Sequence, residues 1–147
     1  MADEIRKGLF RISVPLPNSP LKDLNSYVIR GEDRNLIIDT GFNRTVCYEA
    51  MQAGLAELGI DLNQTDFMLT HMHADHTGLV TRLATKTSRI FFGRIDARVF
   101  DGDHGWQSLI DFAALNGFPV DELQKALASH PGFKYSPQKK PVFTLLD

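Results

Sequence analysis

Four side chains that can bind a metal ion fall close together in this chain: His71, His73, Asp75 and His76. They belong to residues 70–78, with the sequence THMHADHTG, which contain three of the chain's histidines. Neutral imidazole is the commonest side-chain metal ligand, and imidazole with carboxylate suits zinc, iron or manganese better than calcium. The residue types therefore predict a metal site rather than a polar loop whose histidines only cap a helix.

The spacing of these residues fits two neighbouring metal ions. An apolar run at 67–69 precedes them like a strand, and residues i and i+2 of a strand point the same way. His71 and His73 can therefore reach one ion. Asp75 and His76 lie where the chain turns from strand to helix, and they can face a second ion. Two ions about 3.5–4 Å apart can share a bridging hydroxide, a strong nucleophile at neutral pH.

Several stretches around this segment predict β-strands, because their apolar residues alternate or form continuous runs. The run at 36–38 is continuous, which predicts burial on both faces. Prolines interrupt the chain after the first predicted strand, since proline cannot continue a strand ladder. The predicted strands cover 9–14, 25–30, 36–39, 66–70 and 89–92, and residues 144–147 also have strand character.

An apolar stripe that contains Cys47 predicts a helix over about 44–58. Asn43 or Thr45 can cap its first turn, and Gly59 is placed to end it. Cys47 lies on the stripe, so we expect a core thiol rather than a reactive one. Further helices are predicted over 77–85, 94–100, 108–115 and 121–129.

Residues 70–78 resemble the T-H-x-H-x-D-H-x-G signature of the metallo-β-lactamase superfamily. Residues 25–29 resemble the early strand of that family, and 36–41 resemble its next strand, which ends in D-T-G. The resemblance runs in the right order from about Leu9 to Phe92. It implies an α+β fold, namely the N-terminal half of an αββα sandwich: a mixed β-sheet with outer helices, plus a helical insert after residue 93. The insert either roofs the substrate pocket or packs only on itself.

The resemblance also implies a second half, which would supply further metal ligands from a P-G-H-like segment. The nearest string, at 130–133, has its histidine on the wrong side of Pro-Gly. We therefore expect residues 1–147 to be an incomplete domain: a core with the metal motif at about 1–93, a helical insert at about 94–140, and no second half. A homodimer, or association with the missing C-terminal half, would cover the exposed sheet. Candidates for that exposed face are Leu36, Ile38, Phe67, Leu69, Ile90 and Phe92.

By resemblance, the parent enzyme is a metal-dependent hydrolase that holds two zinc ions, with iron or manganese as alternatives. His71 and His73 bind one metal, and Asp75 and His76 bind the other. A metal-bound hydroxide attacks a small ester, thioester or lactone, and Asp75 also acts catalytically by orienting that nucleophile or passing its proton on. Asp39 either hydrogen-bonds near the ligand turn and orients an imidazole or serves only as a turn residue.

Two other functions stay open at this point. An iron-dependent thiol or persulfide dioxygenase of the same superfamily shares much of the motif. In a different class, the chain is a non-catalytic, self-associating half-domain, and in either case the isolated chain is expected to be inactive.

Composition narrows the partners and the compartment. The net charge is −2 and no cluster of basic residues exceeds Lys139-Lys140, which argues against nucleic acid. No apolar run approaches the roughly 20 residues of a membrane span, and no signal peptide is visible. With a single cysteine there is no intrachain disulfide. We expect a cytoplasmic protein that acts on a small molecule.

Overall fold

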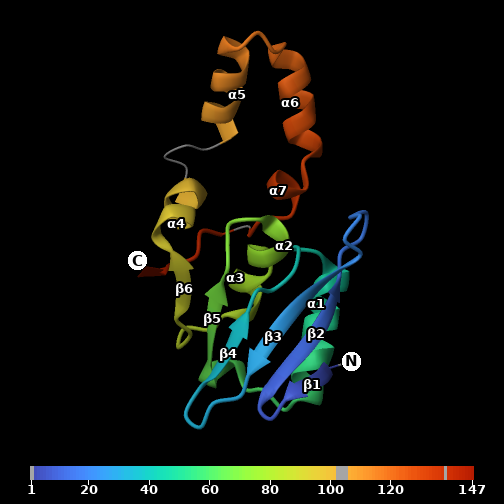
Figure 1. Cartoon of the computed structure of the whole chain (residues 1–147), viewed down its shortest axis with the longest axis vertical. Coiled ribbons are helices and arrows are strands. Elements are labelled where there is room, and N and C mark those ends of the chain that lie inside the picture. Colours follow the sequence, from blue (N-terminus) through green and yellow to red (C-terminus); the bar gives the residue numbers. More distant parts are fainter. Residues whose placement is uncertain (1, 102–105, 138) are drawn as a thin grey trace.

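The computed structural model describes residues 2–101, 106–137 and 139–147. They form one mixed sheet of seven strands, which lie side by side in their order along the chain (Figure 1). Strands β1 to β4 are antiparallel to their neighbours, whereas β4 to β7 run parallel. The strands are β1 (Ala2–Arg6), β2 (Leu9–Pro15), β3 (Asp23–Ile29), β4 (Asn35–Ile38), β5 (Thr65–Leu69), β6 (Ile90–Gly93) and β7 (Thr144–Leu146).

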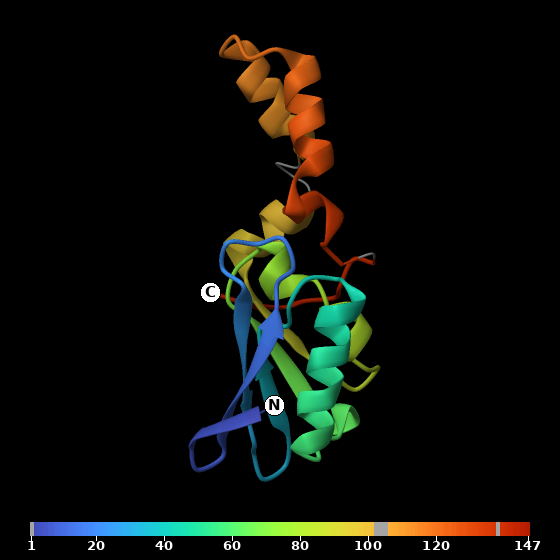
Figure 2. The same cartoon turned by 90° about the vertical axis from the view of Figure 1, so that its right-hand side faces the viewer.

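The helices that connect β4, β5 and β6 all lie on one face of the sheet (Figure 2). They are α1 (Thr45–Glu57), the 3-10 helix η1 (Leu62–Gln64), α2 (Ala74–Thr77) and α3 (Val80–Leu83). Between β6 and β7 the chain forms α4 (Arg94–Asp101), α5 (Trp106–Leu115), α6 (Val120–Ser129) and α7 (Pro131–Lys134), and α5 and α6 extend well beyond the sheet. The predicted α+β fold, with a mixed sheet, outer helices and an insert after residue 93, is confirmed.

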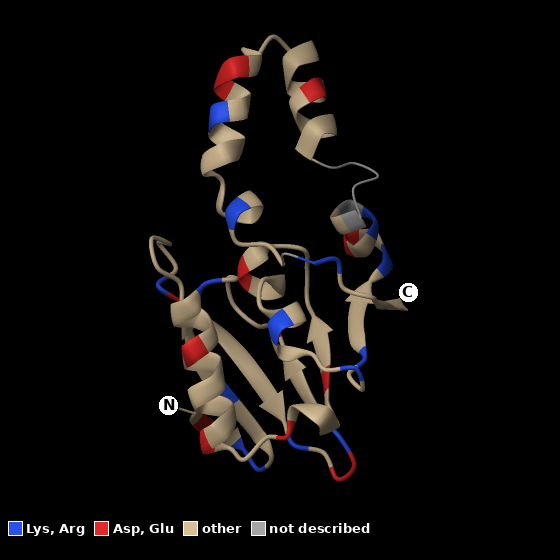
Figure 3. Ribbon diagram, turned by 180° about the vertical axis from the view of Figure 1, so that it is seen from behind, with Lys and Arg blue, Asp and Glu red and all other residues tan. Residues whose placement is uncertain are grey.

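The surface of the protein carries charges of both signs. Lys and Arg residues occur on several separate elements, and Asp and Glu residues lie among them (Figure 3). In the part of the chain that the structure describes, no helix combines the length and apolar character needed to cross a membrane.

The core lies between the sheet and helices α1 to α3. Val28, Ile37, Phe67 and Ile90 are register neighbours on four adjacent strands, and all four are buried. Cys47 is also fully buried, and its thiol donates to the carbonyl oxygen of Pro15 at 3.0 Å. The prediction of a core thiol is therefore confirmed.

Among the described residues, no helix lies over the opposite face of the sheet (Figure 2). Tyr27, Ile38, Met68 and Phe91 are register neighbours across this open face, and each is only half-buried. The continuous run at 36–38 is thus not buried on both faces, because only Ile37 points into the core.

The predicted set of open-face residues was therefore partly wrong. Leu36 and Ile38 do lie on the open face, but the other candidates point toward the helices and are buried: Phe67, Leu69, Ile90 and Phe92. Alternation defines two sets of residues in a strand, whereas pairing with neighbouring strands decides which set meets the helices.

Every strand predicted from the sequence is present, and the helix predicted at 44–58 is α1. Its N-cap is Arg44, with no side-chain capping bond, so neither Asn43 nor Thr45 caps it. The side-chain amide of Asn43 instead donates to the carbonyl oxygen of Ser136 at 3.3 Å. Gly59 ends the helix with a φ of 64°, as expected of a glycine after the last turn. The polar strand β1 and the short helix α7 were not predicted.

The single helix predicted at 77–85 was wrong, because the structure has two short helices, α2 and α3. The break falls at Gly78 and Leu79. The backbone N–H of Leu79 donates to the carbonyl oxygen of Gly41 at 3.1 Å rather than continuing the helix. Gly78 is needed there, since an added Cβ would lie 2.5 Å from the backbone nitrogen of Asn43. Close approach of the 41–43 segment therefore divides the helix.

The buried carboxylate of Asp66 links the amino-terminal ends of the parallel strands β4, β5 and β6. Asp66 accepts hydrogen bonds from Arg34 Nε at 3.1 Å and Nη2 at 2.8 Å, and from Arg89 Nε at 2.9 Å. Burial favours the neutral acid, but the hydrogen bonds from the two guanidinium groups outweigh it and hold the pKa of Asp66 well below its usual range.

We expect Asp66→Asn to lower the free energy of unfolding at neutral pH by about 2–3 kcal/mol, because it leaves two guanidinium groups without their anion. The depressed folded-state pKa means that this contribution is present above the unfolded-state pKa and is lost as the pH falls through the folded value. Urea unfolding should therefore show the difference between wild type and variant narrowing below about pH 4. Asp33→Asn, at an exposed turn position, is the control. A pH-independent difference would contradict this explanation.

Candidate metal centre

The four ligand-type residues lie at the carboxyl end of β5 and in the first turn of α2, at one edge of the parallel strands (Figure 1). Ligands of open α/β sheets bind outside the carboxyl ends of the strands. β4 also ends at this edge, and it delivers Asp39 beside the same turn. The sheet thus brings residues from two strand ends together.

The structure arranges the four side chains as two pairs. His71 Nε2 and His73 Nδ1 lie 3.0 Å apart, and His76 Nε2 lies 3.6 Å from Asp75 Oδ2. Two ligand atoms on one tetrahedral zinc ion are about 3.3 Å apart for bonds of about 2.0–2.1 Å. Each pair therefore has a spacing that one ion could bridge, and the rings of His71 and His76 are close, with centroids 4.0 Å apart.

The two pairs do not make a complete metal site. Within the described ranges, no group of three or more His, Cys, Asp or Glu side chains is arranged to hold a metal ion. Catalytic zinc normally has three protein ligands and a water. The donor set present here fits part of such a site, and metal ligation by these residues stays a prediction.

Asp39 fixes the orientation of His76. Its carboxylate accepts from His76 Nδ1 at 2.8 Å, from the backbone N–H of Thr70 at 2.9 Å and from the Thr70 hydroxyl at 2.8 Å. With Nδ1 as the donor, Nε2 of His76 keeps its lone pair and faces Asp75. A carboxylate behind an imidazole orients metal-binding histidines. The interpretation of Asp39 as a hydrogen-bonding partner of the ligand turn is therefore confirmed.

The backbone of Asp39 has a φ of 59°, which is uncommon for a residue other than glycine. Asparagine and aspartate tolerate this conformation best. The three hydrogen bonds to the carboxylate explain why the strand end keeps it.

Thr70 orients the other imidazole. Its hydroxyl donates to Asp39, so a lone pair remains to accept the Nδ1 proton of His71, at 3.0 Å. That tautomer leaves Nε2 of His71 free toward His73. One hydroxyl group and one carboxylate thus define which nitrogen each of the two histidines presents.

The pKa values of His71 and His76 are shifted in opposite directions from the ordinary value. Burial, together with the positive charges that His76 and His73 can carry, lowers the pKa of His71. Burial also opposes the charged form of His76, but the hydrogen bond and the charge of Asp39, with the charge of Asp75, raise its pKa. At neutral pH His71 is thus neutral, whereas His76 holds its second proton more firmly.

The residues after β4 also clamp helix α2. The backbone N–H and the hydroxyl of Thr40 both donate to the carbonyl oxygen of His76, at 2.8 and 2.9 Å. The Thr40 hydroxyl in turn accepts from the backbone N–H of Leu79 at 3.2 Å. Thr40 therefore positions the turn that carries Asp75 and His76.

Sequence reasoning missed the contacts of Thr40 and Thr70, and it also missed a contact from the insert to the ligand turn. Asp96, in the first turn of α4, accepts a hydrogen bond from the backbone N–H of Met72 at 3.0 Å. Met72 lies between His71 and His73, so this bond holds the backbone that spaces them. Its sequence signal is an acidic residue just beyond the next parallel strand, whose carboxyl end lies at the same edge of the sheet.

We expect the isolated chain to hold zinc weakly, because each ion has only two protein ligands here. Asp39→Ala should weaken zinc binding further, by about 10- to 100-fold, since His76 loses its orienting carboxylate. Competition with a chromophoric chelator measures both affinities, and Asp121→Ala on exposed α6 serves as the control. Two tightly held zinc ions per chain after dialysis, without a partner chain, would contradict the expectation.

Comparison with known proteins supports the family resemblance. A sequence profile of the metallo-beta-lactamase superfamily matches residues 21–131. A search of curated proteins found no match.

Solved structures with a similar fold include the metallo-beta-lactamase family protein TTHA1429 from Thermus thermophilus. It is 25% identical with a TM-score of 0.70, and the match covers 96% of this chain and 47% of that one. A beta-lactamase domain protein from Burkholderia ambifaria is 19% identical with a TM-score of 0.69, over 99% of this chain and 44% of that one. The class B3 di-zinc metallo-beta-lactamase LRA-12 from an Alaskan soil metagenome is 23% identical with a TM-score of 0.50, over 61% and 31% of the two chains.

The chain spans about half the length of the two proteins that match it over nearly all its residues. The profile covers most of the chain, including both the segment that ends β4 and the paired histidines after β5. The chain belongs to the metallo-beta-lactamase superfamily.

Proposed function

We propose that the full-length protein is a metal-dependent hydrolase of a small ester, thioester or lactone. One observation carries the proposal: Asp39 fixes His76 through Nδ1, so that Nε2 faces the carboxylate of Asp75. A metal-binding histidine normally donates its other ring N–H to such a carboxylate, so this orientation supports His76 as a metal ligand. Membership of the superfamily supports the same reaction class.

Zinc is the cofactor that we propose, with two ions in the complete site and iron or manganese as alternatives. His71 and His73 would hold one ion, and Asp75 and His76 would hold the other. When bound, such ions lower the pKa of water and polarise the carbonyl group under attack. The di-zinc relative with a similar fold supports this choice of metal.

The chain's own residues orient the groups and move the proton. Asp75 is half-buried in the first turn of α2, where its carboxylate can accept a proton from the attacking water and pass it to the leaving group. Asp39 and Thr70 keep His76 and His71 in fixed tautomers throughout. Proton transfer needs an acceptor within hydrogen-bonding reach of the water, and the carboxylate of Asp75 lies 3.6 Å from His76 Nε2, on the side where the ion would bind.

The remaining ligands are proposed to come from a second polypeptide segment, either a C-terminal half or another chain. The relatives that match nearly the whole chain are about twice as long. We therefore propose that the 147 residues alone are inactive, and that activity appears when the open face of the sheet is covered.

Metal analysis combined with a substrate panel tests the proposal. The protein that supplies both halves is loaded separately with zinc, manganese or iron, and is assayed on a nitrophenyl ester, an acyl thioester and an acyl lactone. Turnover with zinc supports the hydrolase. Oxygen consumption with iron and a thiol or persulfide would identify the dioxygenase instead, and no turnover with any metal would favour the non-catalytic half-domain.

A further inference from the structure

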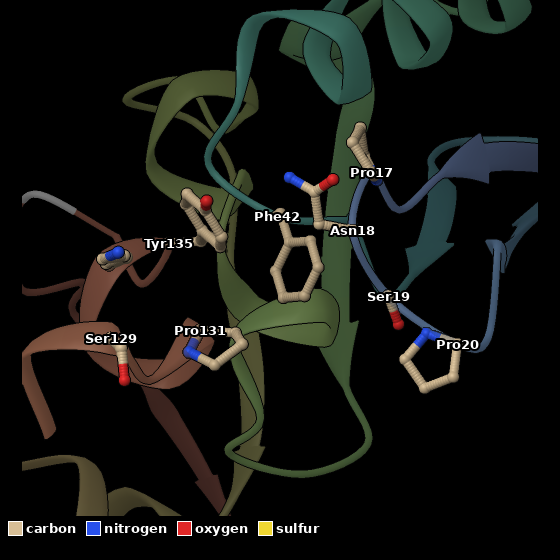
Figure 4. Close-up of a pocket in the computed structure, with 9 residues that line it drawn as sticks. Pro17, Asn18, Ser19, Pro20, Phe42, Ser129, Pro131 and Tyr135 are labelled. Carbon is tan, nitrogen blue, oxygen red and sulfur yellow. The ribbon is translucent and has the colours of Figure 1, made fainter. Parts of the chain in front are cut away.

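A cavity of about 280 Å³ opens where three segments of the chain meet (Figure 4). One wall is the loop between β2 and β3, another is the segment before α1, and the third is the junction of α6 and α7. Its lining residues are Pro17, Asn18, Ser19, Pro20, Phe42, Ser129, Pro131, Lys134 and Tyr135.

The walls of this cavity are tied together by the segment before α1. Arg44 Nη1 donates to the carbonyl oxygen of Pro17 at 3.2 Å, and its guanidinium lies over the ring of Tyr135 at 5.1 Å. The backbone N–H of Asn43 donates to the carbonyl oxygen of Tyr135 at 2.9 Å. Phe42 packs against the same ring, with centroids 5.1 Å apart. These contacts join all three segments, so the cavity is formed before any ligand enters.

The lining combines flat apolar surfaces with one positive charge. Three proline rings and two aromatic rings supply the apolar part. Lys134 supplies the charge, and its ammonium group has no ion-pair or hydrogen-bonding partner among the residues that the structure describes. Asn18 and Ser19 add polar side chains to the lining. Such sites bind an apolar body and orient it through a few polar groups.

We propose that this cavity binds a small organic anion with a flat apolar body, such as an aromatic carboxylate. The volume lies just below the roughly 300–1,000 Å³ of sites for drug-sized ligands, which favours a molecule with a single ring. The ring stacks among the proline and aromatic side chains, and the carboxylate accepts a hydrogen bond from Lys134.

The cavity is coupled by backbone contacts to the metal motif. Phe42 follows the segment in which Thr40 holds the carbonyl oxygen of His76, and α7 lies against α2. A ligand in the cavity therefore rests on the segment that positions the candidate ligands. The site itself consists of other residues, so binding does not depend on the hydrolase proposal.

The single tryptophan provides a direct measurement of binding. The ring of Trp106 packs at a tilt against that of His130, with ring centroids 4.9 Å apart, and His130 immediately precedes the Pro131 wall. We expect 3-phenylpropionate to change Trp106 fluorescence saturably in the presence of a metal chelator. Calorimetric titration of the same pair detects binding that leaves the fluorescence unchanged.

The contribution of the Lys134 charge to binding is tested with a neutral ligand and with a variant of the protein. The amide 3-phenylpropanamide should bind about fivefold more weakly than the acid, and Lys134→Gln should weaken the acid about fivefold while leaving the amide unaffected. Lys125→Gln is the matched control, because Lys125 is an exposed lysine on α6 that pairs with Asp121 and does not line the cavity. Absence of saturable binding in both measurements would overturn the proposal. So would a Lys134→Gln protein that folds by circular dichroism and still prefers the acid.

Discussion

Replacing Asp75 with alanine is expected to lower turnover of the proposed full-length hydrolase by about 100- to 10,000-fold, the range spanned by loss of a positioned proton acceptor. The same change removes one of the two protein ligands proposed for the second metal ion. Asp75 is half-buried and lies outside the hydrophobic core, so the fold should persist. Steady-state kinetics on the best ester, thioester or lactone, with circular dichroism as a check on folding, measure the effect.

Asp121→Ala is a matched control, because Asp121 occupies the first turn of another helix, is well exposed and pairs with Lys125 on that same helix. It should leave both kcat and KM unchanged. If the Asp75→Ala enzyme turns over at nearly the wild-type rate with zinc bound, the assignment of Asp75 is wrong.

The second large effect concerns association of the 147-residue chain. We expect it to form dimers or larger species at micromolar concentration, because the open face presents Tyr27, Ile38, Met68 and Phe91 side by side and no helix in the described part of the chain covers them. Contiguous apolar patches of more than a few hundred Å² are rare on soluble monomers. Two copies can pack these faces about a two-fold axis, since such a contact is self-complementary.

Light scattering on Met68→Lys tests this interface, because a charge at the middle of the open face should raise the dissociation constant at least about tenfold. Val142→Lys is the control: Val142 is 90% exposed and lies outside the sheet. A wild-type chain that is a clean monomer at micromolar concentration would refute the expectation. Equal effects of the two lysines would place the interface elsewhere.

Local patterns were sufficient to predict the elements that surround the site. The apolar stripe that contains Cys47 was sufficient to predict α1, because helical periodicity is a property of neighbouring residues. The spacing of His71, His73, Asp75 and His76 likewise lies within one short segment, and Asp39 could be connected to it because both follow adjacent strands. The family signature covered the same residues.

Features that depend on distant contacts were not predictable in this way. The break between α2 and α3 arises from a bond between Leu79 and Gly41, and the support of Met72 comes from Asp96 on a later helix. Alternation could not decide that Phe67 meets the helices while Met68 faces outward. In each case the residues that decide the structure are distant in the sequence, so the local sequence pattern does not indicate the contact.

The order of the strands also affects how the protein folds during its synthesis. Since each strand lies beside the strand that precedes it in the chain, the sheet can grow by adding one strand at a time to a free edge as the polypeptide leaves the ribosome. Among the first six strands, pairing between successive segments keeps loop closure short, which favours fast folding, whereas β7 pairs with β6 only after the insert. The metal motif follows β5, so it would already be anchored to Asp39 before the insert is synthesised. Mutations in α5 or α6 should accordingly leave nascent-chain folding of the first six strands intact.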